Sequence, residues 1–218
     1  MAARPSPRRS SLAKRPRPLT AKRILTDRAD ALPALAEAFR EHGFEGASLA
    51  TLSKATGLGK GSLYNFFPGG KVEMMDAVLA EIDDWFAMTI FVPLEQAADP
   101  ASAIGAMIED VTAYFQSGGR VCLVGWLGLG ASGDVFAVRI SGYFSRWISA
   151  LAHCLEASAL PSSLALRLAE ETVAGIQGAI VLARALREEA AFVRIVRRLE
   201  GILLDAVACH GRSDAQPA

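Results

Sequence analysis

Apolar residues recur at intervals of three and four from Leu32 to the C-terminal region, and strict alternation of apolar and polar residues is absent. Such spacing places apolar side chains on one face of an α-helix, whereas a half-buried β-strand needs alternation. The pattern therefore predicts an all-α fold of about nine helices. We expect helices over residues 30–42, 48–56, 60–67, 71–86, 102–116, 121–131, 135–157, 162–186 and 190–209, with residues 92–100 as a connection.

Local sequence signals predict where the first helices begin and end. Asp30 is expected to cap the first helix, because a short polar side chain can accept hydrogen bonds from free N-terminal amides. Gly43 is expected to end it. By the same rules Ser48 caps the second helix and Gly57 ends it. The sequence Pro68-Gly69-Gly70 then interrupts the helical pattern, so a small N-terminal unit precedes a larger C-terminal one.

Three glycines, Gly57, Gly59 and Gly61, occupy alternate positions, although a glycine inside a helix is about 1 kcal/mol less favourable than alanine. Gly57 suits a left-handed helix end, Gly59 the cap of a third helix, and Gly61 a backbone that approaches a partner closely. Two short helices joined by a Gly-containing turn form a helix-turn-helix, whose second helix enters the DNA major groove. The alternatives are an ordinary turn between packed helices and a phosphate loop, but the G-x-x-x-x-G-K-[ST] order is missing.

The formal net charge is zero, but the charges are unevenly distributed along the chain. Residues 1–23 contain eight Lys and Arg, no acidic residue, and four prolines that prevent a continuous helix. We expect a disordered basic tail that adds salt-dependent, sequence-independent affinity for DNA. A solubilising tail without a partner and an organellar transit peptide are the alternatives.

The cysteines and the apolar runs indicate a cytoplasmic protein. Cys122, Cys154 and Cys209 are odd in number and widely spaced, which argues against a secreted disulfide framework. No apolar run reaches the roughly 18 residues of a membrane span, so no membrane partner is expected. The two adjacent His and Cys pairs lack the spacing of zinc ligands. We therefore expect neither a metal nor a cofactor.

The stretch AEAFREHGFEGASLATLSKATGLGKGSLYNFFPGGKVEMMDAVL, residues 36–79, resembles the N-terminal domain of the tetracycline-repressor (TetR) family of bacterial transcriptional regulators. The most specific motifs are F-x-x-x-G-F at residues 39–44, A-T-G-L at 55–58 and K-G-S-L-Y-x-x-F-P at 60–68. The sequence departs from the family at Gly59, where Ser is frequent, and at Asn65 and Phe66, where His and Tyr are frequent. The operator sequence of relatives therefore does not transfer to this chain.

The resemblance implies a homodimer that binds a palindromic double-stranded DNA operator and a small-molecule effector. It divides the chain into the tail (1–23), a helix-turn-helix DNA-binding domain (24–71) and a ligand-binding and dimerisation domain (72–218). Tyr64 and Lys71 are expected to hold phosphates, while Ser62 and Asn65 contact base edges. By position, the DNA-facing residues are Ser48, Lys60, Gly61, Ser62, Tyr64, Asn65 and Lys71.

The C-terminal part contains candidate ligand-binding residues. We expect Phe115, Trp126 and Tyr143 to line a cavity, although each of them alone is more commonly a core residue, because ligand pockets are mostly apolar. Cys122 follows Arg120 at a predicted helix start, where the helix dipole and the guanidinium would lower the pKa of the thiol and make it reactive. A buried, inert cysteine is the alternative.

The last two predicted helices are the expected dimer surface. The first contains small residues such as Gly175 and Gly178 that allow close approach of another helix. The second contains more apolar residues than one helix needs to anchor itself. Two such helices from each protomer would form a four-helix interface about a two-fold axis.

These observations predict a ligand-responsive DNA-binding transcriptional regulator, a repressor that a small apolar effector releases from a palindromic operator by tilting the fourth helix. The alternatives are a regulator that senses electrophiles or redox state through a cysteine, and a non-specific DNA-packaging protein that binds through its tail. An enzyme is not expected, because no nucleophile–base pair or paired carboxylates at matching helical spacing are visible.

Overall fold

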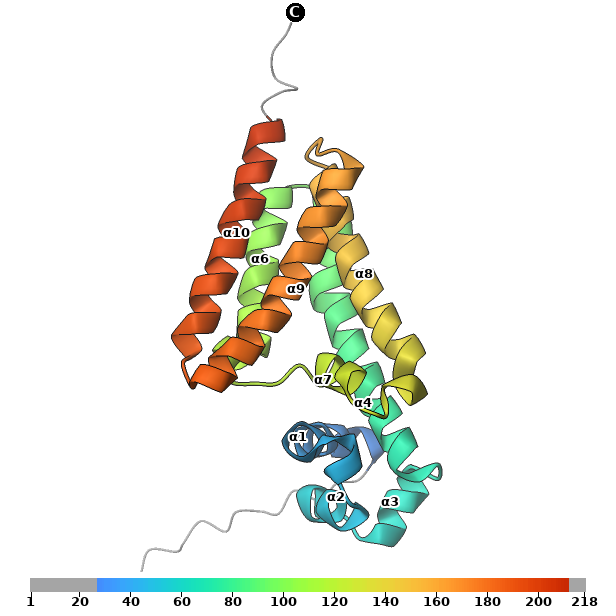
Figure 1. Cartoon of the computed structure of the whole chain (residues 1–218). Coiled ribbons are helices and arrows are strands. Elements are labelled where there is room, and N and C mark those ends of the chain that lie inside the picture. Colours follow the sequence, from blue (N-terminus) through green and yellow to red (C-terminus); the bar gives the residue numbers. More distant parts are fainter. Residues whose placement is uncertain (1–26, 212–218) are drawn as a thin grey trace, which may run out of the picture.

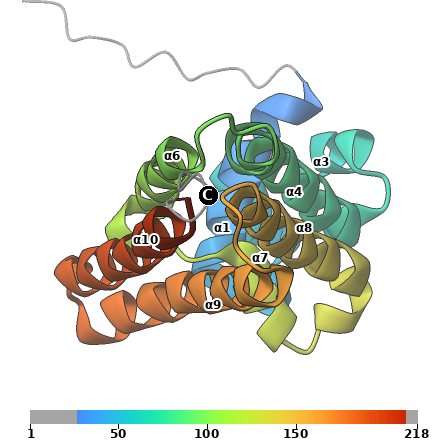
Figure 2. The same cartoon turned by 90° about the horizontal axis from the view of Figure 1, so that it is seen from above.

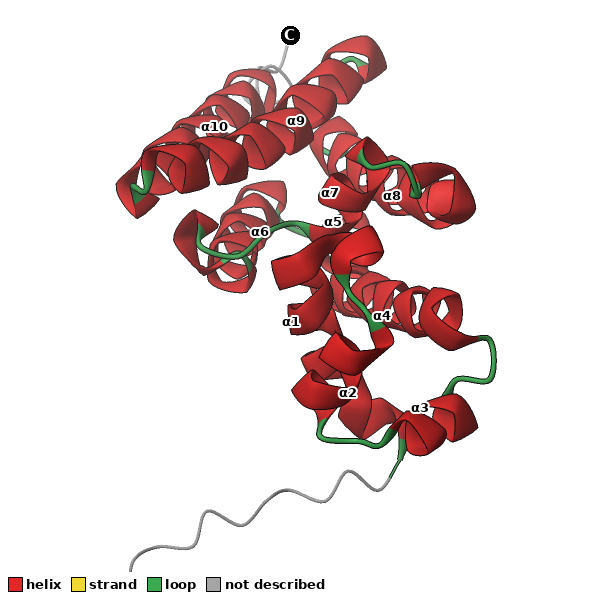
Figure 3. Ribbon diagram, turned by 60° about the horizontal axis from the view of Figure 1, so that its bottom comes forward, coloured by secondary structure: helices red, strands yellow, loops and turns green. Residues whose placement is uncertain are grey.

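The computed structural model describes residues 27–211, and within this range every regular element is helical (Figure 3). Nine of the described α-helices contain seven residues or more, and α5 contains only four. The predicted all-α fold is therefore confirmed for the described part of the chain. The predicted basic tail, residues 1–23, lies outside the described residues.

The helices follow one another with short connections. In chain order they are α1 (Arg28–Gly46), α2 (Leu49–Thr56), α3 (Lys60–Phe66), α4 (Gly70–Phe86), α5 (Val92–Glu95), α6 (Pro100–Tyr114), α7 (Leu123–Leu129), α8 (Ala137–Glu156), α9 (Ser162–Leu186) and α10 (Glu189–Gly211). A π-helical segment, η1 (Ala87–Phe91), and two 3₁₀ turns, η2 (Gln116–Gly118) and η3 (Gly133–Phe136), complete the described chain.

The first helix begins earlier than the sequence predicted. Asp27, not Asp30, is the cap, and its carboxylate accepts a hydrogen bond from the Asp30 amide at 2.9 Å. The extra turn brings Ala31 into the core, where it is fully buried. Gly43 interrupts α1 as predicted, with a φ of 70°, and one further turn follows it to Gly46.

The predicted helix-turn-helix is present. The Ser48 hydroxyl caps α2 by accepting from the Thr51 amide at 3.1 Å. Gly57 ends α2 in the left-handed region at φ 71° and ψ 5°. Gly59 caps α3 without a side-chain hydrogen bond. The two helices are therefore joined by a three-residue turn, as the glycine spacing predicted.

The prediction that residues 92–100 form a connection is wrong for their first half. After Phe86 the helical path continues through the π-helical η1 and then α5, so the turn to α6 comes only at residues 96–99. Ile90, Phe91 and Leu94 are all buried, which explains why the chain stays helical here. Pro93 lies in the first turn of α5, where a proline is tolerated.

The helices form two groups at opposite ends of the molecule (Figure 1). Helices α1, α2 and α3 lie at one end. At the other end α6, α8, α9 and α10 pack beside one another (Figure 2). The long helix α4 packs against α1 and then continues into the larger group. A continuous helix thus connects the candidate DNA-binding unit to the rest of the chain.

Candidate nucleic-acid interface and effector cleft

Helix α3 has one buried face and one exposed face. Leu63, inside the helix, and Phe67, at its end, are fully buried and hold α3 against the small N-terminal unit. Phe66 is partly buried and also packs against the core. Five predicted DNA-facing residues are exposed: Lys60, Gly61, Ser62, Tyr64 and Asn65. The described chain therefore leaves the amino end of α3 free to meet a partner.

The open space around two glycines also indicates that the amino end of α3 can meet a partner. A β-carbon added at Gly59 or at Gly61 would meet no atom within 4 Å. Packing within the described chain therefore gives no reason for glycine at either position. A partner that approaches the backbone of α3 closely would supply one.

Two other predicted DNA-facing residues already make contacts within the chain. The Ser48 hydroxyl is used in the cap of α2, and it also lies 2.9 Å from the Thr51 hydroxyl. The Lys71 ammonium donates to the Phe44 carbonyl at 2.8 Å and lies 4.6 Å from the centre of the Phe44 ring. Lys71 thus ties the start of α4 to the end of α1. Its contact with a phosphate stays a prediction.

A cleft of about 740 Å³ lies between α1, α7, α8 and α9. Cys122 and Trp126, both predicted as ligand-binding residues, line it. Most of the lining is apolar and comes from α7, α8 and α9. The full lining is Arg40, Glu41, Val121, Cys122, Gly125, Trp126, Gly128, Leu129, Ile140, Phe144, Gln177, Gly178, Ile180, Val181 and Arg184. Its volume is in the range of small-molecule sites.

The predicted lining must be corrected for the other two aromatic residues. Phe115 is fully buried and packs against Phe86, with ring centres 6.2 Å apart. Tyr143 also packs against Phe86, at 4.9 Å, and lines a separate hollow of about 210 Å³ beside α4. Both residues belong to the aromatic core around α4. Aromatic side chains fill a core and a pocket equally well, so sequence spacing did not separate the two roles.

The expected low pKa of Cys122 is wrong. Cys122 does stand at the start of α7, and its sulfur accepts from the Gly125 amide at 3.3 Å. Burial nevertheless raises the pKa of the Cys122 thiol above its ordinary value, because desolvation outweighs this hydrogen bond. The Arg120 guanidinium binds Glu37 at 2.6 Å. The hypothesis of a reactive, electrophile-sensing cysteine at this position loses its chemical basis.

Two polar residues of the cleft were missed by the sequence analysis. Arg40 of α1 is only 7% exposed, and Gln177 of α9 has a buried amide nitrogen. Arg40 follows Ala36 by four residues on the apolar face of α1, and Gln177 interrupts an apolar run. A polar residue on an otherwise apolar helix face was the available signal for both.

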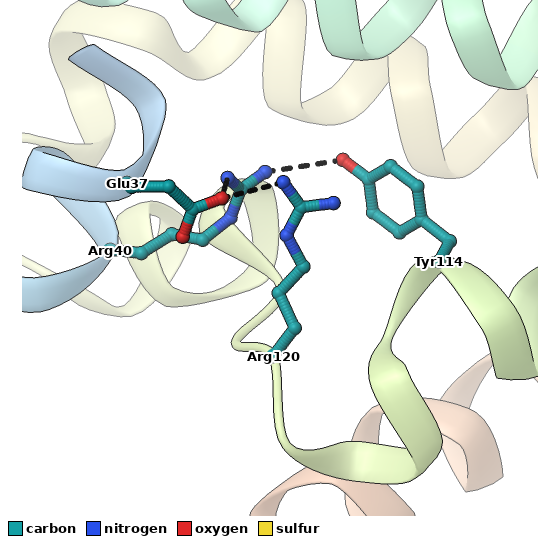
Figure 4. Close-up of polar contacts among 4 residues, drawn as sticks. All are labelled: Glu37, Arg40, Tyr114 and Arg120. Atoms are coloured by element: carbon teal, nitrogen blue, oxygen red, sulfur yellow. Dashed lines mark hydrogen bonds and ion pairs between the residues drawn. The ribbon is translucent and has the colours of Figure 1, made fainter. Parts of the chain in front are cut away.

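Arg40 belongs to a polar cluster that joins the two groups of helices (Figure 4). One oxygen of Glu37 accepts from Arg40 at 2.7 Å and from Arg120 at 2.6 Å. The second Arg40 amino group donates to the Tyr114 hydroxyl at 3.2 Å. Burial raises the pKa of Tyr114, so this hydroxyl stays protonated at neutral pH. The cluster links α1 to the end of α6 and to the segment before α7.

Further contacts join the end of α1 to the segment around α7 and η3. Glu45 accepts from the Ser132 amide at 3.1 Å, and hydrogen bonds from Ser132 help to lower the pKa of the Glu45 carboxyl. The rings of Phe44 and Phe136 meet edge to face at 5.3 Å. A β-carbon added at Gly43 would lie 3.4 Å from the Trp126 ring, so this ring covers Gly43. The end of α1 is thus held by the segment that also forms the cleft.

Comparison with known families matches both parts of the chain. Residues 32–78 match the model of bacterial regulatory proteins of the tetR family. Residues 100–198 match the C-terminal domain of LmrA/YxaF-like transcriptional regulators. The chain belongs to the TetR family. The members of this family are transcriptional regulators, and the residues matched by the N-terminal model include α3.

Individual relatives agree with the assignment. The HTH-type transcriptional regulator LmrA of Bacillus subtilis is 32% identical over 84 residues, which is 38% of this chain and 45% of that protein. An uncharacterized HTH-type transcriptional regulator of Mycobacterium tuberculosis, MT0206, is 24% identical over 76% of this chain and 88% of its own length. The crystal structure of a regulatory TetR protein from Rhodobacter sphaeroides has a TM-score of 0.68 and 25% identity, covering 79% of this chain and 96% of that one.

Membrane spans and metal clusters were sought among the residues that the structure describes. In residues 27–211, none of the TetR-family protein's helices combines the length and the apolar composition needed to cross a bilayer. The same residues bring together no group of three His, Cys, Asp or Glu side chains suited to a metal ion.

Proposed function

We propose that this protein is a homodimeric repressor that binds a palindromic operator and leaves it when a small, mostly apolar effector occupies the cleft. The observation that carries the proposal is the exposed polar face of α3, with open space around Gly61. In a helix-turn-helix this face enters the major groove. The TetR family is one of ligand-responsive DNA-binding repressors, and the cleft supplies a place for a ligand.

Each exposed residue of α3 receives a role in the proposal. Ser62 and Asn65 contact base edges, because a hydroxyl bonds several bases and Asn pairs with adenine through two hydrogen bonds. Lys60 and Tyr64 hold phosphates and so set the position of the helix. Gly61 allows the backbone to come close to the DNA. Ser48 and Lys71 add phosphate contacts from the starts of α2 and α4.

The proposed dimer forms through α9 and α10. Leu182 and Leu186 of α9 and Ile202 of α10 are exposed, at 46%, 61% and 40%. Several of the small residues predicted for this interface are used inside the chain instead. A β-carbon at Gly175, for example, would lie 2.8 Å from Leu199, so Gly175 lets α9 and α10 of one protomer approach each other.

The proposed switch begins at α1 rather than with the expected tilt of the fourth helix, because the lining of the cleft includes Arg40 and Glu41 of α1 and no residue of α4. A ligand that moves α1 also moves α3, because both helices share the buried core of the small unit. The two recognition helices of a dimer must lie about 34–36 Å apart, or a multiple of it, to enter successive grooves. A coupling of about 1–3 kcal/mol would change operator affinity roughly 5- to 150-fold.

Selection from a random DNA library tests the proposal. The purified chain should enrich a palindrome whose half-sites are about 10–10.5 base pairs apart, or a multiple, because each recognition helix enters the same face of the duplex. A chain lacking residues 1–22 should enrich the same palindrome at lower affinity, since the basic tail adds only non-specific binding. Loss of all DNA binding on removal of the tail would favour the DNA-packaging alternative.

A further inference from the structure

The cleft has an apolar body and an end that contains hydrogen-bond donors. Trp126, Ile140, Phe144 and Ile180 provide apolar lining. Arg40 and Gln177 line the other part, and both lie close enough to influence the Cys122 thiol. The chemistry of this polar end narrows the class of ligand that the cleft accepts.

Arg40 is a buried cation with unused hydrogen-bonding capacity. Its side chain is 6% exposed, and its terminal nitrogens bind Glu37 and Tyr114. Its third nitrogen, Nε, is buried without a hydrogen-bond partner. A buried donor without an acceptor is unfavourable, so a ligand acceptor gains affinity if the guanidinium turns toward the cleft and exposes Nε.

Gln177 presents a second buried donor. Its Nε2 is buried, and the amide hydrogen-bonds the Cys122 thiol, which is a weak acceptor. Gly125 makes room for the amide, because a β-carbon there would lie 2.8 Å from the Gln177 Oε1. An uncharged amide and a guanidinium both donate to a carboxylate, and neither nitrogen can accept.

The acidic residues nearby do not occupy these donors. Glu41 lines the cleft, but its side chain is 76% exposed and lies 3.6 Å from His42. Glu37 is already shared between Arg40 and Arg120 through one oxygen. Glu81 of α4 contributes an electrostatic interaction with Arg40. A ligand is a further source of an acceptor for Arg40.

We propose that the cleft binds an aromatic carboxylate, with its ring among Trp126 and Phe144 and its carboxylate on Arg40 and Gln177. This proposal rests on the proposed function, because it names the effector class of the same cleft. A carboxylate on Arg40 competes with Tyr114 for the guanidinium. Binding therefore weakens the Arg40 hydrogen bond to Tyr114 that joins α1 to α6, and α1 becomes free to shift relative to α6.

Calorimetric titration of the full chain with 2-naphthoate and 2-naphthamide tests the proposal. The two probes share one ring system, but only the first is an anion. We expect 2-naphthoate to bind at least about tenfold more tightly, since charge-assisted hydrogen bonds to a buried guanidinium are stronger than neutral ones. In Arg40→Met this preference should disappear, because 2-naphthoate loses more affinity than 2-naphthamide when the guanidinium is removed.

Two glycine variants locate the site without touching the polar cluster. Gly178 of α9 lines the cleft and Gly142 of α8 does not, and a β-carbon at either position meets no atom within 4 Å. Gly178→Leu should weaken both probes at least about tenfold, because the new side chain occupies the cleft. Gly142→Leu should bind both probes like the parent chain.

The proposal is wrong if the two probes bind equally, or if neither binds with a dissociation constant below about 1 mM. It is also wrong if the preference for 2-naphthoate survives Arg40→Met, or if Gly178→Leu leaves the binding of both probes unchanged. If Arg40→Met does not fold, as judged by circular dichroism, Gln177→Leu decides, and it should reduce the preference at least about threefold. Operator binding is measured on the same samples. Retained operator binding without a response to 2-naphthoate refutes the ligand class and leaves the repressor function standing.

Discussion

At the scale of single residues, Gly61 is where stability and DNA binding are expected to conflict. Its position in the first turn of α3 has open space where a side chain would lie. Gly61→Ala should therefore raise the free energy of unfolding by up to about 1 kcal/mol, because alanine favours a helix. The same change should weaken operator binding, since the added methyl group separates the backbone from the DNA. Urea unfolding and fluorescence anisotropy measure the two effects.

Gly142→Ala in α8 is the matched control for Gly61→Ala. It also adds a β-carbon to a helix where no atom lies within 4 Å. It should stabilise the chain by a similar amount, about 0.5–1 kcal/mol, and leave operator affinity unchanged. If Gly61→Ala and Gly142→Ala have equal effects on operator affinity, the proposed close approach at Gly61 does not occur.

The three cysteines should differ in reactivity according to their burial. Burial raises the pKa of Cys154 to about 11 and also raises that of Cys122, whereas Cys209 is exposed. Iodoacetamide at pH 7.5 should modify Cys122 at least about tenfold faster in urea than in the folded chain, because only the thiolate reacts. Mass spectrometry of the digested protein gives the rates. Equal rates at Cys122 in the folded and unfolded chain would show that this thiol is accessible.

The raised thiol pKa values also predict an alkaline loss of stability. A thiol in the unfolded chain ionises near pH 8.5, roughly the ordinary value for cysteine. The folded chain keeps Cys154 protonated up to about pH 11. The folded state binds the thiol proton more tightly than the unfolded state. Cys154 therefore adds its full contribution to the free energy of unfolding below the unfolded pKa, and this contribution is lost as the pH rises from there toward 11. Replacing Cys154 by alanine should remove part of this pH dependence of urea unfolding.

At the scale of elements, the turn between α2 and α3 determines how the recognition helix is presented. Gly57 has a φ of 71°, a conformation that costs an ordinary residue about 1–2 kcal/mol. Gly57→Ala should lower the free energy of unfolding by about that amount, and Gly57→Asn by less, because Asn tolerates this conformation. Urea unfolding compares the two variants. An alanine variant as stable as the parent would mean that the turn is not strained.

Most elements were predictable because their signals are local. The cap of α2, the left-handed end at Gly57 and the break at Gly43 each depend on a few adjacent residues. The outward-facing residues of α3 were expected from the resemblance to the TetR family, and Lys60 to Ser62, Tyr64 and Asn65 are exposed. The first turn of α1 was missed because two Asp residues, 27 and 30, are both suitable caps. The helical course of residues 87–95 was missed because Pro93 usually marks a connection.

The whole-molecule arrangement depends on contacts between residues far apart in the sequence, which local patterns do not report. Arg40 meets Tyr114 across 74 positions, and Arg120 meets Glu37 across 83. The two polar anchors of the cleft therefore emerged only from the structure. Phe115 and Tyr143 show the converse case: their apolar character was correctly recognised, but their position in the core rather than the cleft was not.

At the same scale, the proposed dimer makes a prediction about assembly. Leu182→Arg on α9 should yield a monomer, because it places a charge in an interface that excludes water. Operator binding should fall with it, since one recognition helix alone contacts half of the site. Met88→Arg, on η1 and 72% exposed, is the matched control and should remain dimeric. Light scattering after size exclusion gives the mass. A Leu182→Arg protein that stays dimeric would place the interface elsewhere.

The central claim is that the amino end of α3 recognises bases from both protomers of a symmetric dimer. Random-library selection with the Asn65→Ala chain, beside the parent chain, tests it most directly. Asn65 is exposed on α3. We predict that the parent selects a palindrome and that Asn65→Ala loses the base preference at one position in each half-site, at about 1–3 kcal/mol per contact. An unchanged preference, or a selected sequence without two-fold symmetry, would contradict the account.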